Sequence, residues 1–181
     1  MGLHRHGRAS GMMNGLSVVA AVAAFATSLL ASAEACQVHC QPDARFPMDF
    51  RLKTYIVEDN VTIRENLVGT LEELTCISAV GFAEAEAEAV RWLAENSDQW
   101  ELAIVDLFLK QGSGLGVVQS VSARRPEQKI VVLSNYATPD IRKRCAQFGV
   151  DAVFDKSNEI DALIDFCIEQ SSQLRQASDS S

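Results

Sequence analysis

The chain has 181 residues, of which 48% are hydrophobic and 22% are charged, and its formal net charge is −8. These fractions are typical of a globular protein and exclude a disordered or collagen-like chain, while the length suits one domain of ordinary size. With 24 acidic residues against 16 basic ones, the chain is not expected to carry the basic face that a nucleic-acid backbone requires. Composition therefore argues against a stand-alone DNA-binding protein.

Residues 1–47 differ in composition from the rest of the chain. They begin with a basic stretch, carry no charge from residue 15 to residue 33, and end the apolar run in Ala31-Ser32-Ala33. These are the three parts of a secretory signal, and the run is also just long enough to span a bilayer. A third interpretation is upstream sequence translated from a wrong start, because Met48 is a natural beginning for the domain that follows. All three interpretations stay open for this leader.

From residue 48 onward, short apolar runs alternate with amphipathic segments. The runs cover residues 55–57, 77–80, 102–105, 130–133 and 150–154, and each predicts a buried strand. Between the first two runs, apolar residues from Ile63 to Leu74 recur at spacings of three and four, which predicts a helix with Asn60 as its N-cap. Five such strands alternating with five helices predict a parallel sheet covered on both faces, the doubly wound α/β three-layer sandwich. We expect this domain to span residues 48–172 and the Ser- and Gln-rich residues 173–181 to form a flexible tail.

Polar residues follow four of these strands, at the sheet edge where doubly wound folds bind ligands. Glu58 and Asp59 follow the first strand, Asp106 the third, Ser134 the fourth and Lys156 the fifth. Crowded carboxylates repel one another unless a cation lies among them, and oxygen ligands at a wet rim suit Mg²⁺. With an ammonium and a hydroxyl added, the set predicts phosphoryl transfer onto a carboxylate. Each residue alone is more often a cap, a turn residue or a solvated charge, so the combination carries the prediction.

At these strand ends the sequence resembles the receiver domain of two-component response regulators, the CheY-like superfamily with a flavodoxin-like sheet. The resemblance covers roughly residues 53–170. The segments that carry it are Tyr55-Ile56-Val57-Glu58-Asp59-Asn60, Ala103-Ile104-Val105-Asp106-Leu107, Val132-Leu133-Ser134 and Phe154-Asp155-Lys156.

The resemblance implies a role for each residue of the predicted site. Asp106 would accept the phosphoryl group, and Ser134 and Lys156 would bind the phosphoryl oxygens. The Mg²⁺ ligands would be Glu58, Asp59, Asp106 and the main-chain carbonyl of Phe108. Tyr136 stands at a position that in this family tunes the access of water to the phosphoryl group.

Three features depart from the family pattern. Val153 occupies the position, three before the lysine, where the family often has an aromatic switch residue, and the adjacent Phe154 should point to the opposite sheet face. Ser157 replaces the proline that commonly follows the lysine, which puts the associated cis peptide bond in question. Only a short stretch follows the last predicted helix, so no output domain is expected.

The resemblance predicts a single-domain response regulator rather than an enzyme with a separate substrate. A histidine kinase or histidine phosphotransfer protein would phosphorylate Asp106, and a downstream protein would read the result by contact, without direct nucleic-acid binding. One alternative is a receiver-like interaction module that is never phosphorylated. A phosphatase of the haloacid dehalogenase kind needs a second acid two residues after the nucleophile, where this chain has Phe108. We expect a cytoplasmic location, because an exported receiver would be separated from cytoplasmic kinases, and the alternative is a membrane tether through residues 15–33.

Overall fold

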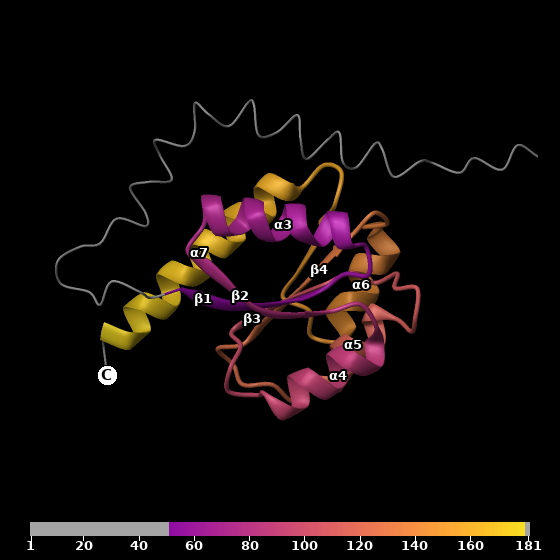
Figure 1. Cartoon of the computed structure of the whole chain (residues 1–181), viewed down its shortest axis with the longest axis horizontal. Coiled ribbons are helices and arrows are strands. Elements are labelled where there is room, and N and C mark those ends of the chain that lie inside the picture. The colour runs from indigo at the N-terminus through magenta and orange to yellow at the C-terminus, as the bar shows by residue number, and fades with distance from the viewer. Residues whose placement is uncertain (1–50, 180–181) are drawn as a thin grey trace, which may run out of the picture.

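The computed structural model describes residues 51–179, so the predicted leader at residues 1–47 lies outside the described residues (Figure 1). Strands and helices alternate throughout the described part, as the sequence predicts. The elements are β1 (Leu52–Val57), α3 (Val61–Leu74), β2 (Ile77–Ala83), α4 (Glu86–Glu95), β3 (Leu102–Val105), α5 (Gly114–Ser120), β4 (Lys129–Ser134), α6 (Pro139–Gln147), β5 (Ala152–Asp155) and α7 (Ile160–Asp179).

The five strands form one parallel sheet in the order β2-β1-β3-β4-β5. From β1 the chain first adds β2 on one side and then returns to add β3 on the other, which makes the fold doubly wound, as predicted. Val57 at the end of β1 pairs with Val105 at the end of β3. The segments that follow these two strands therefore start side by side, at the point where such sheets bind ligands.

Two apolar cores cover the two faces of the sheet. Helices α3 and α7 lie over one face, and α4 and α5 lie over the other together with α6 (Figure 1). Along β3, Leu102 and Ile104 belong to the core under α3 and α7, whereas Ala103 and Val105 belong to the opposite core. A strand buried on both sides has no place for a polar residue, which explains the uninterrupted apolar run.

Short polar side chains fix where three of the helices begin. The side chain of Asn60 accepts a hydrogen bond from the main-chain N–H of Ile63, as the sequence predicts, and Ser113 caps α5 in the same way. The side chain of Thr138 caps α6, with Pro139 in the first turn. Each cap satisfies a main-chain donor that the helix itself leaves without a partner.

The structure corrects the predicted end of the domain. Helix α7 continues to Asp179, past the predicted boundary at residue 172 and into the segment, residues 173–181, that the sequence predicts to be a flexible tail. The hydroxyls of Ser171 and Ser172 donate to main-chain oxygens one turn earlier, and Leu174 packs against the core. These serines therefore bond within the helix instead of competing with it.

Smaller differences concern strand ends, since β2 extends three residues past the predicted Val80 and β5 begins at Ala152 instead of Val150. Within residues 51–179, no helix has both the length and the apolar character needed to cross a membrane.

Candidate functional site

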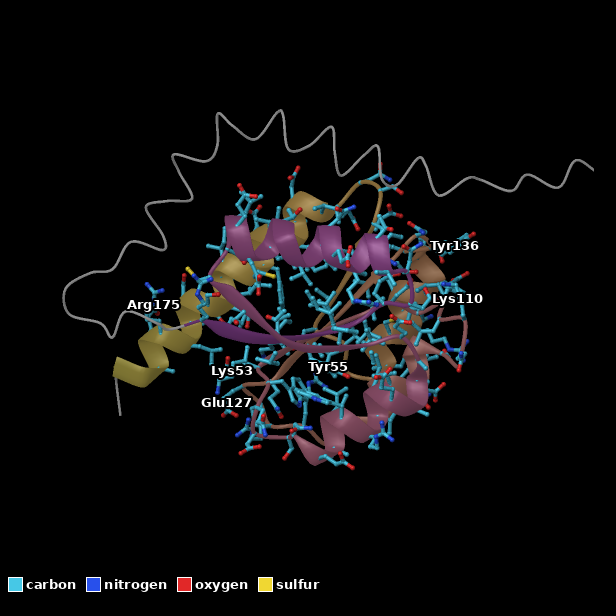
Figure 2. The ribbon with its side chains drawn as sticks, in the orientation of Figure 1. Lys53, Tyr55, Lys110, Glu127, Tyr136 and Arg175 are labelled. Atoms are coloured by element: carbon cyan, nitrogen blue, oxygen red, sulfur yellow. The ribbon has the colours of Figure 1, made fainter. Side chains whose placement is uncertain are left out.

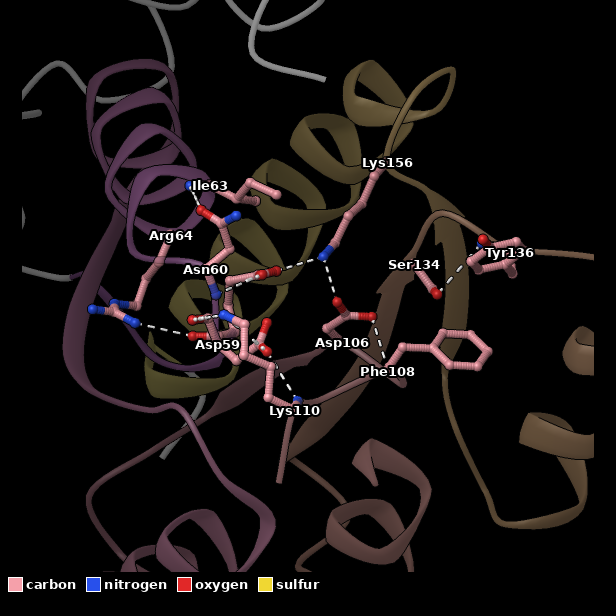
Figure 3. Close-up of polar contacts among 11 residues, drawn as sticks. Asp59, Asn60, Ile63, Arg64, Asp106, Phe108, Lys110, Ser134, Tyr136 and Lys156 are labelled. Atoms are coloured by element: carbon pink, nitrogen blue, oxygen red, sulfur yellow. Dashed lines mark hydrogen bonds and ion pairs between the residues drawn. The ribbon is translucent and has the colours of Figure 1, made fainter. Parts of the chain in front are cut away.

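Lys156 joins two of the predicted carboxylates at the carboxyl edge of the sheet. Its Nζ lies 2.5 Å from Oε2 of Glu58 and 2.6 Å from Oδ2 of Asp106 (Figure 3). The side chain of Lys156 is 3% exposed, so this ammonium is compensated by carboxylates rather than by water. Residues that follow β1, β3 and β5 thus meet at one point, as the strand-end prediction requires.

Asp106 is held at the end of β3 by main-chain and side-chain contacts. Its N–H donates to the main-chain oxygen of Val57 at 2.9 Å, which continues the pairing of β1 and β3 by one residue. Its carboxylate accepts from Lys156 through Oδ2 and from the main-chain N–H of Phe108 through Oδ1 at 3.2 Å. The residue is 9% exposed, so the carboxylate lies at the rim rather than in the open.

Glu58 is the most enclosed of the three acids, at 3% exposure. The main-chain N–H of Asn60 donates to its Oε1 at 3.1 Å, and Arg64 of α3 donates to its main-chain oxygen at 3.0 Å. Burial raises the pKa of Glu58 above its ordinary value, and the ammonium of Lys156 opposes this shift. The ion pair with Lys156 is therefore what favours the charged form of this acid.

Asp59 has a different cationic partner, Lys110, in the loop between β3 and α5. The main-chain N–H of Lys110 donates to Oδ2 of Asp59 at 2.9 Å, and its Nζ lies 3.4 Å from the same oxygen. The ammonium also donates to the main-chain oxygen of Asp59 at 3.2 Å. Sequence reasoning missed Lys110, because it lies in a loop and the strand-end pattern gives no indication of it.

Ser134 lies at the same edge, at the end of β4, and is fully buried. Its main-chain oxygen accepts from the N–H of Lys156 at 3.1 Å, which ties the two residues together. Its hydroxyl oxygen accepts a long hydrogen bond, at 3.5 Å, from the main-chain N–H of Tyr136. Figure 3 shows this hydroxyl on the same side of the sheet edge as Asp106.

Two exposed aromatic rings border Asp106 and Ser134. Phe108 is 55% exposed and Tyr136 is 62% exposed, and their ring centroids lie 5.1 Å apart in an edge-to-face arrangement (Figure 3). Both rings come from loops that start at the site, after β3 and after β4. The role of Tyr136 in the access of water, which the resemblance implies, stays a prediction.

The two residues before the β5 end face opposite cores, as predicted. Val153 packs against the core under α4, α5 and α6, whereas Phe154 packs in the other core with its ring 5.9 Å from that of Phe166. The ring of Phe154 therefore does not occupy the place that an aromatic residue at position 153 would fill. Residues 51–179 contain no cis peptide bond, in agreement with Ser157 in place of proline.

The donor set fits Mg²⁺ in kind. It offers three carboxylates and the main-chain oxygen of Phe108, and hard oxygen ligands in small number are what this ion binds. In this structure, however, the described residues contain no cluster of three or more acidic, histidine or cysteine side chains converged on one point. Each of the three acids instead contacts an ammonium through one of its two carboxylate oxygens.

The fold and this edge define an α/β protein of the CheY-like class. A family model described as the response regulator receiver domain matches residues 54–167, and the chain belongs to this family. A curated relative, a cyclic di-GMP phosphodiesterase of Thermotoga maritima, is 32% identical over 108 residues, which cover 60% of this chain and 28% of the relative. The chain thus spans less than a third of that relative's length.

Solved structures show the same fold at low sequence identity. A LuxR-family DNA-binding response regulator from Staphylococcus aureus aligns with a TM-score of 0.58 and 17% identity, over 66% of this chain and 99% of that one. The response regulator domain of Thermotoga maritima CheB aligns with a TM-score of 0.56 and 16% identity, over 68% and 95%. A Burkholderia pseudomallei response regulator with a phosphorylated aspartic acid and a calcium ion aligns with a TM-score of 0.55 and 20% identity, over 70% and 72%.

Proposed function

We propose that this receiver accepts a phosphoryl group on Asp106 from a histidine kinase or a histidine phosphotransfer protein. The observation that carries the proposal is the buried ammonium of Lys156, which lies 2.6 Å from the Asp106 carboxylate at the ligand-binding edge of the sheet. In the transfer, the phosphorus–nitrogen bond of the donor breaks as a bond from a carboxylate oxygen of Asp106 to phosphorus forms. The chain's part is to position the nucleophile and neutralise charge, which is most of what phosphoryl transfer requires.

Each residue at the edge has a role in this transfer. Oδ1 of Asp106 is the freer oxygen, because Phe108 contacts it by one main-chain N–H whereas Lys156 binds Oδ2. After transfer, Lys156 and the Ser134 hydroxyl bind phosphoryl oxygens. Mg²⁺, held by Glu58, Asp59, Asp106 and the main-chain oxygen of Phe108, would supply further charge neutralisation when bound. Phe108 and Tyr136 restrict the access of water and so slow hydrolysis of the acyl phosphate.

The signal would pass onward by protein contact. A phosphoryl group adds close to two negative charges beside Lys156 and Ser134. These residues lead directly into the loops before α6 and α7, so the population of packings of α6, β5 and α7 would shift and a downstream protein would bind one of them. The net charge of −8 supports a protein target over direct nucleic-acid contact, and dependence on a kinase supports a cytoplasmic location.

The test is phosphorylation of the full chain by a small acyl phosphate in the presence of Mg²⁺. Intact-mass analysis should show one added phosphoryl group in the wild type and in Asp165→Asn, an exposed acid on α7. It should show none in Asp106→Asn. Equal labelling of Asp106→Asn and the wild type would refute the proposal. No labelling of any variant, with a folded protein, would favour a receiver-like interaction module, to which the absence of an aromatic side chain at Val153 lends some support.

A further inference from the structure

Two ammonium groups share the three carboxylates of this edge, and they differ sharply in exposure. The Lys156 side chain is 3% exposed and contacts Glu58 and Asp106. The Lys110 side chain is 74% exposed and contacts Asp59, whose own side chain is only 12% exposed. Asp59 therefore has little water around it, and Lys110 is the cation that compensates its charge.

These two ammonium groups differ in how easily they can leave. Withdrawal of Lys156 would leave two nearly buried carboxylates without a partner, which is strongly unfavourable. The Lys110 ammonium is already mostly solvated, so moving it away from Asp59 and into water costs little free energy. Exposed ion pairs of this kind are weak. The main-chain N–H of Lys110 would keep its 2.9 Å contact with Oδ2 of Asp59 and hold the carboxylate in place.

We infer that the Lys110 ammonium competes with Mg²⁺ for the carboxylate of Asp59, so that the ion binds by displacing the ammonium and Lys110 lowers the affinity of the site for the ion. The inference rests on the proposed function, because it needs Asp59 as a Mg²⁺ ligand. Lys110 acts here through Asp59 and is a residue that sets affinity, not one that contacts the transferred group. Binding of Mg²⁺ is then a competition between the free divalent ion and the singly charged ammonium of Lys110, which is covalently part of the chain.

The experiment is a titration of the full chain with magnesium chloride alone, followed by amide NMR shifts. At low ionic strength, Lys110→Met should bind Mg²⁺ roughly two- to fivefold more tightly than the wild type, the range expected for an exposed ion pair. Lys110→Gln should behave like Lys110→Met, and Lys110→Arg should stay near the wild type because it keeps the charge. Raising the salt concentration should shrink the difference, since screening weakens exposed pairs.

Lys53→Met is the matched control for net charge. Lys53 is exposed in β1 and lies far from Lys110 (Figure 2), so its removal should leave the Mg²⁺ affinity unchanged. Equal affinity in Lys110→Met and the wild type would overturn the inference, and so would an equal gain in Lys53→Met. If the wild type binds Mg²⁺ and Asp59→Asn does not, the proposed metal site is supported, and the Lys110 variants alone then test the inference. Absence of binding in the wild type, or undiminished binding in Asp59→Asn, would remove the proposed metal site and this inference together.

Discussion

At the scale of single residues, Lys156 connects the ends of three other strands of the sheet, two through its side chain and one through its main chain. Its ammonium contacts Glu58 after β1 and Asp106 after β3, and its main-chain N–H donates to Ser134 at the end of β4. Both acids are nearly buried, so their charges rely on this contact. The same residue therefore supports the fold and, under the proposed function, positions Asp106 for phosphoryl transfer.

Replacing Lys156 by methionine should lower the free energy of unfolding by about 3 kcal/mol at neutral pH, because it leaves two enclosed carboxylates without a cation. Urea unfolding of the full chain measures this change. Lys53→Met removes the same charge from an exposed position near the start of β1 and should change the unfolding free energy by less than about 0.5 kcal/mol. An unchanged urea midpoint in Lys156→Met would contradict the importance of the buried pair.

Gly114 is needed where the chain passes directly over the main chain of Asp106. A Cβ at Gly114 would lie 1.9 Å from the main-chain oxygen of Asp106, which neither backbone can accommodate without moving. Gly114→Ala should therefore destabilise the protein by about 1–3 kcal/mol and shift Asp106, with reduced labelling by the acyl phosphate. Gly69→Ala is the control, since a Cβ there meets nothing within 4 Å and alanine should stabilise α3 by about 0.5–1 kcal/mol. Thermal unfolding should show a lower melting temperature for Gly114→Ala and a higher one for Gly69→Ala than for the wild type.

The strand-end rule predicted the contacts of Glu58, Asp106 and Lys156 because parallel strands bring their carboxyl ends to one edge whatever the details of the loops. It missed the pairing of Asp59 with Lys110, which depends on the path of the loop between β3 and α5. Loop paths are set by tertiary contacts, such as the hydrogen bond from the main-chain N–H of Ser113 to Glu86, and leave no periodic pattern in the sequence. The prediction that the Ser134 side chain binds phosphoryl oxygens stays a prediction.

At the scale of elements, one arginine of α6 joins the segments that carry Ser134 and Lys156. Nε of Arg142 donates to the main-chain oxygen of Ala137 at 3.1 Å, and Nη1 donates to that of Val153. Nη2 lies 2.5 Å from Oε2 of Glu159 at the start of α7. The guanidinium thus connects the loop before α6, strand β5 and helix α7, in a region where no aromatic residue fills position 153.

This connection predicts a pH-dependent stability. The hydrogen bond from Arg142 is the main cause that lowers the pKa of Glu159 below its usual 4.5. A lowered pKa in the folded state means that the pair stabilises the protein above the usual glutamate pKa, and that this stability is lost as the pH falls through the lowered value. Arg142→Met should cost about 1 kcal/mol at pH 7, since the pair is partly exposed, and less near pH 3.

Urea unfolding at the two pH values measures the difference. Arg144→Met, an exposed arginine of the same helix, is the control and should show little loss at either pH. Some loss should persist in Arg142→Met at low pH, because the bonds to the two main-chain oxygens do not depend on the charge of Glu159. A loss of unfolding free energy in Arg142→Met that is larger at pH 3 than at pH 7 would contradict a stabilising pair between Arg142 and ionised Glu159.

The elements themselves were largely predictable, because a strand buried on both faces must be an unbroken apolar run and its flanking helices must be amphipathic. The end of α7 was not. Its serines and glutamines are typical of fraying ends, but Leu174 and the buried Ser171 attach this part of the helix to the core. These contacts join residues far apart in the sequence, so the local composition around residues 171–179 cannot predict them.

At the scale of the whole molecule, one sheet separates two cores, and each core contains one free cysteine. Cys145 lies in the core under α4, α5 and α6, and Cys167 lies in the core under α3 and α7. Burial raises the pKa of both thiols, that of Cys167 to about 12. Since the thiolate is the reactive form, neither should react in the folded protein.

Alkylation followed by peptide mass analysis tests this at pH 8. Both cysteines should stay unmodified in the native protein, and both should become modified over the same range of urea if the two cores unfold as one unit. Earlier modification of Cys167 than of Cys145 would show that the α3 and α7 layer opens separately. Modification of either under native conditions, at the rate of a free thiol, would contradict the burial.

The contacts of Lys156 also bear on when the protein becomes competent during its synthesis. Lys156 is 98 residues from Glu58 and 50 from Asp106 along the chain, and it follows β5, the edge strand that is made last. A chain still on the ribosome can therefore contain Glu58 and Asp106 well before the lysine that contacts both of them has been added. Under the proposed function, a product truncated before residue 156 lacks the ammonium that would bind the phosphoryl oxygens on Asp106.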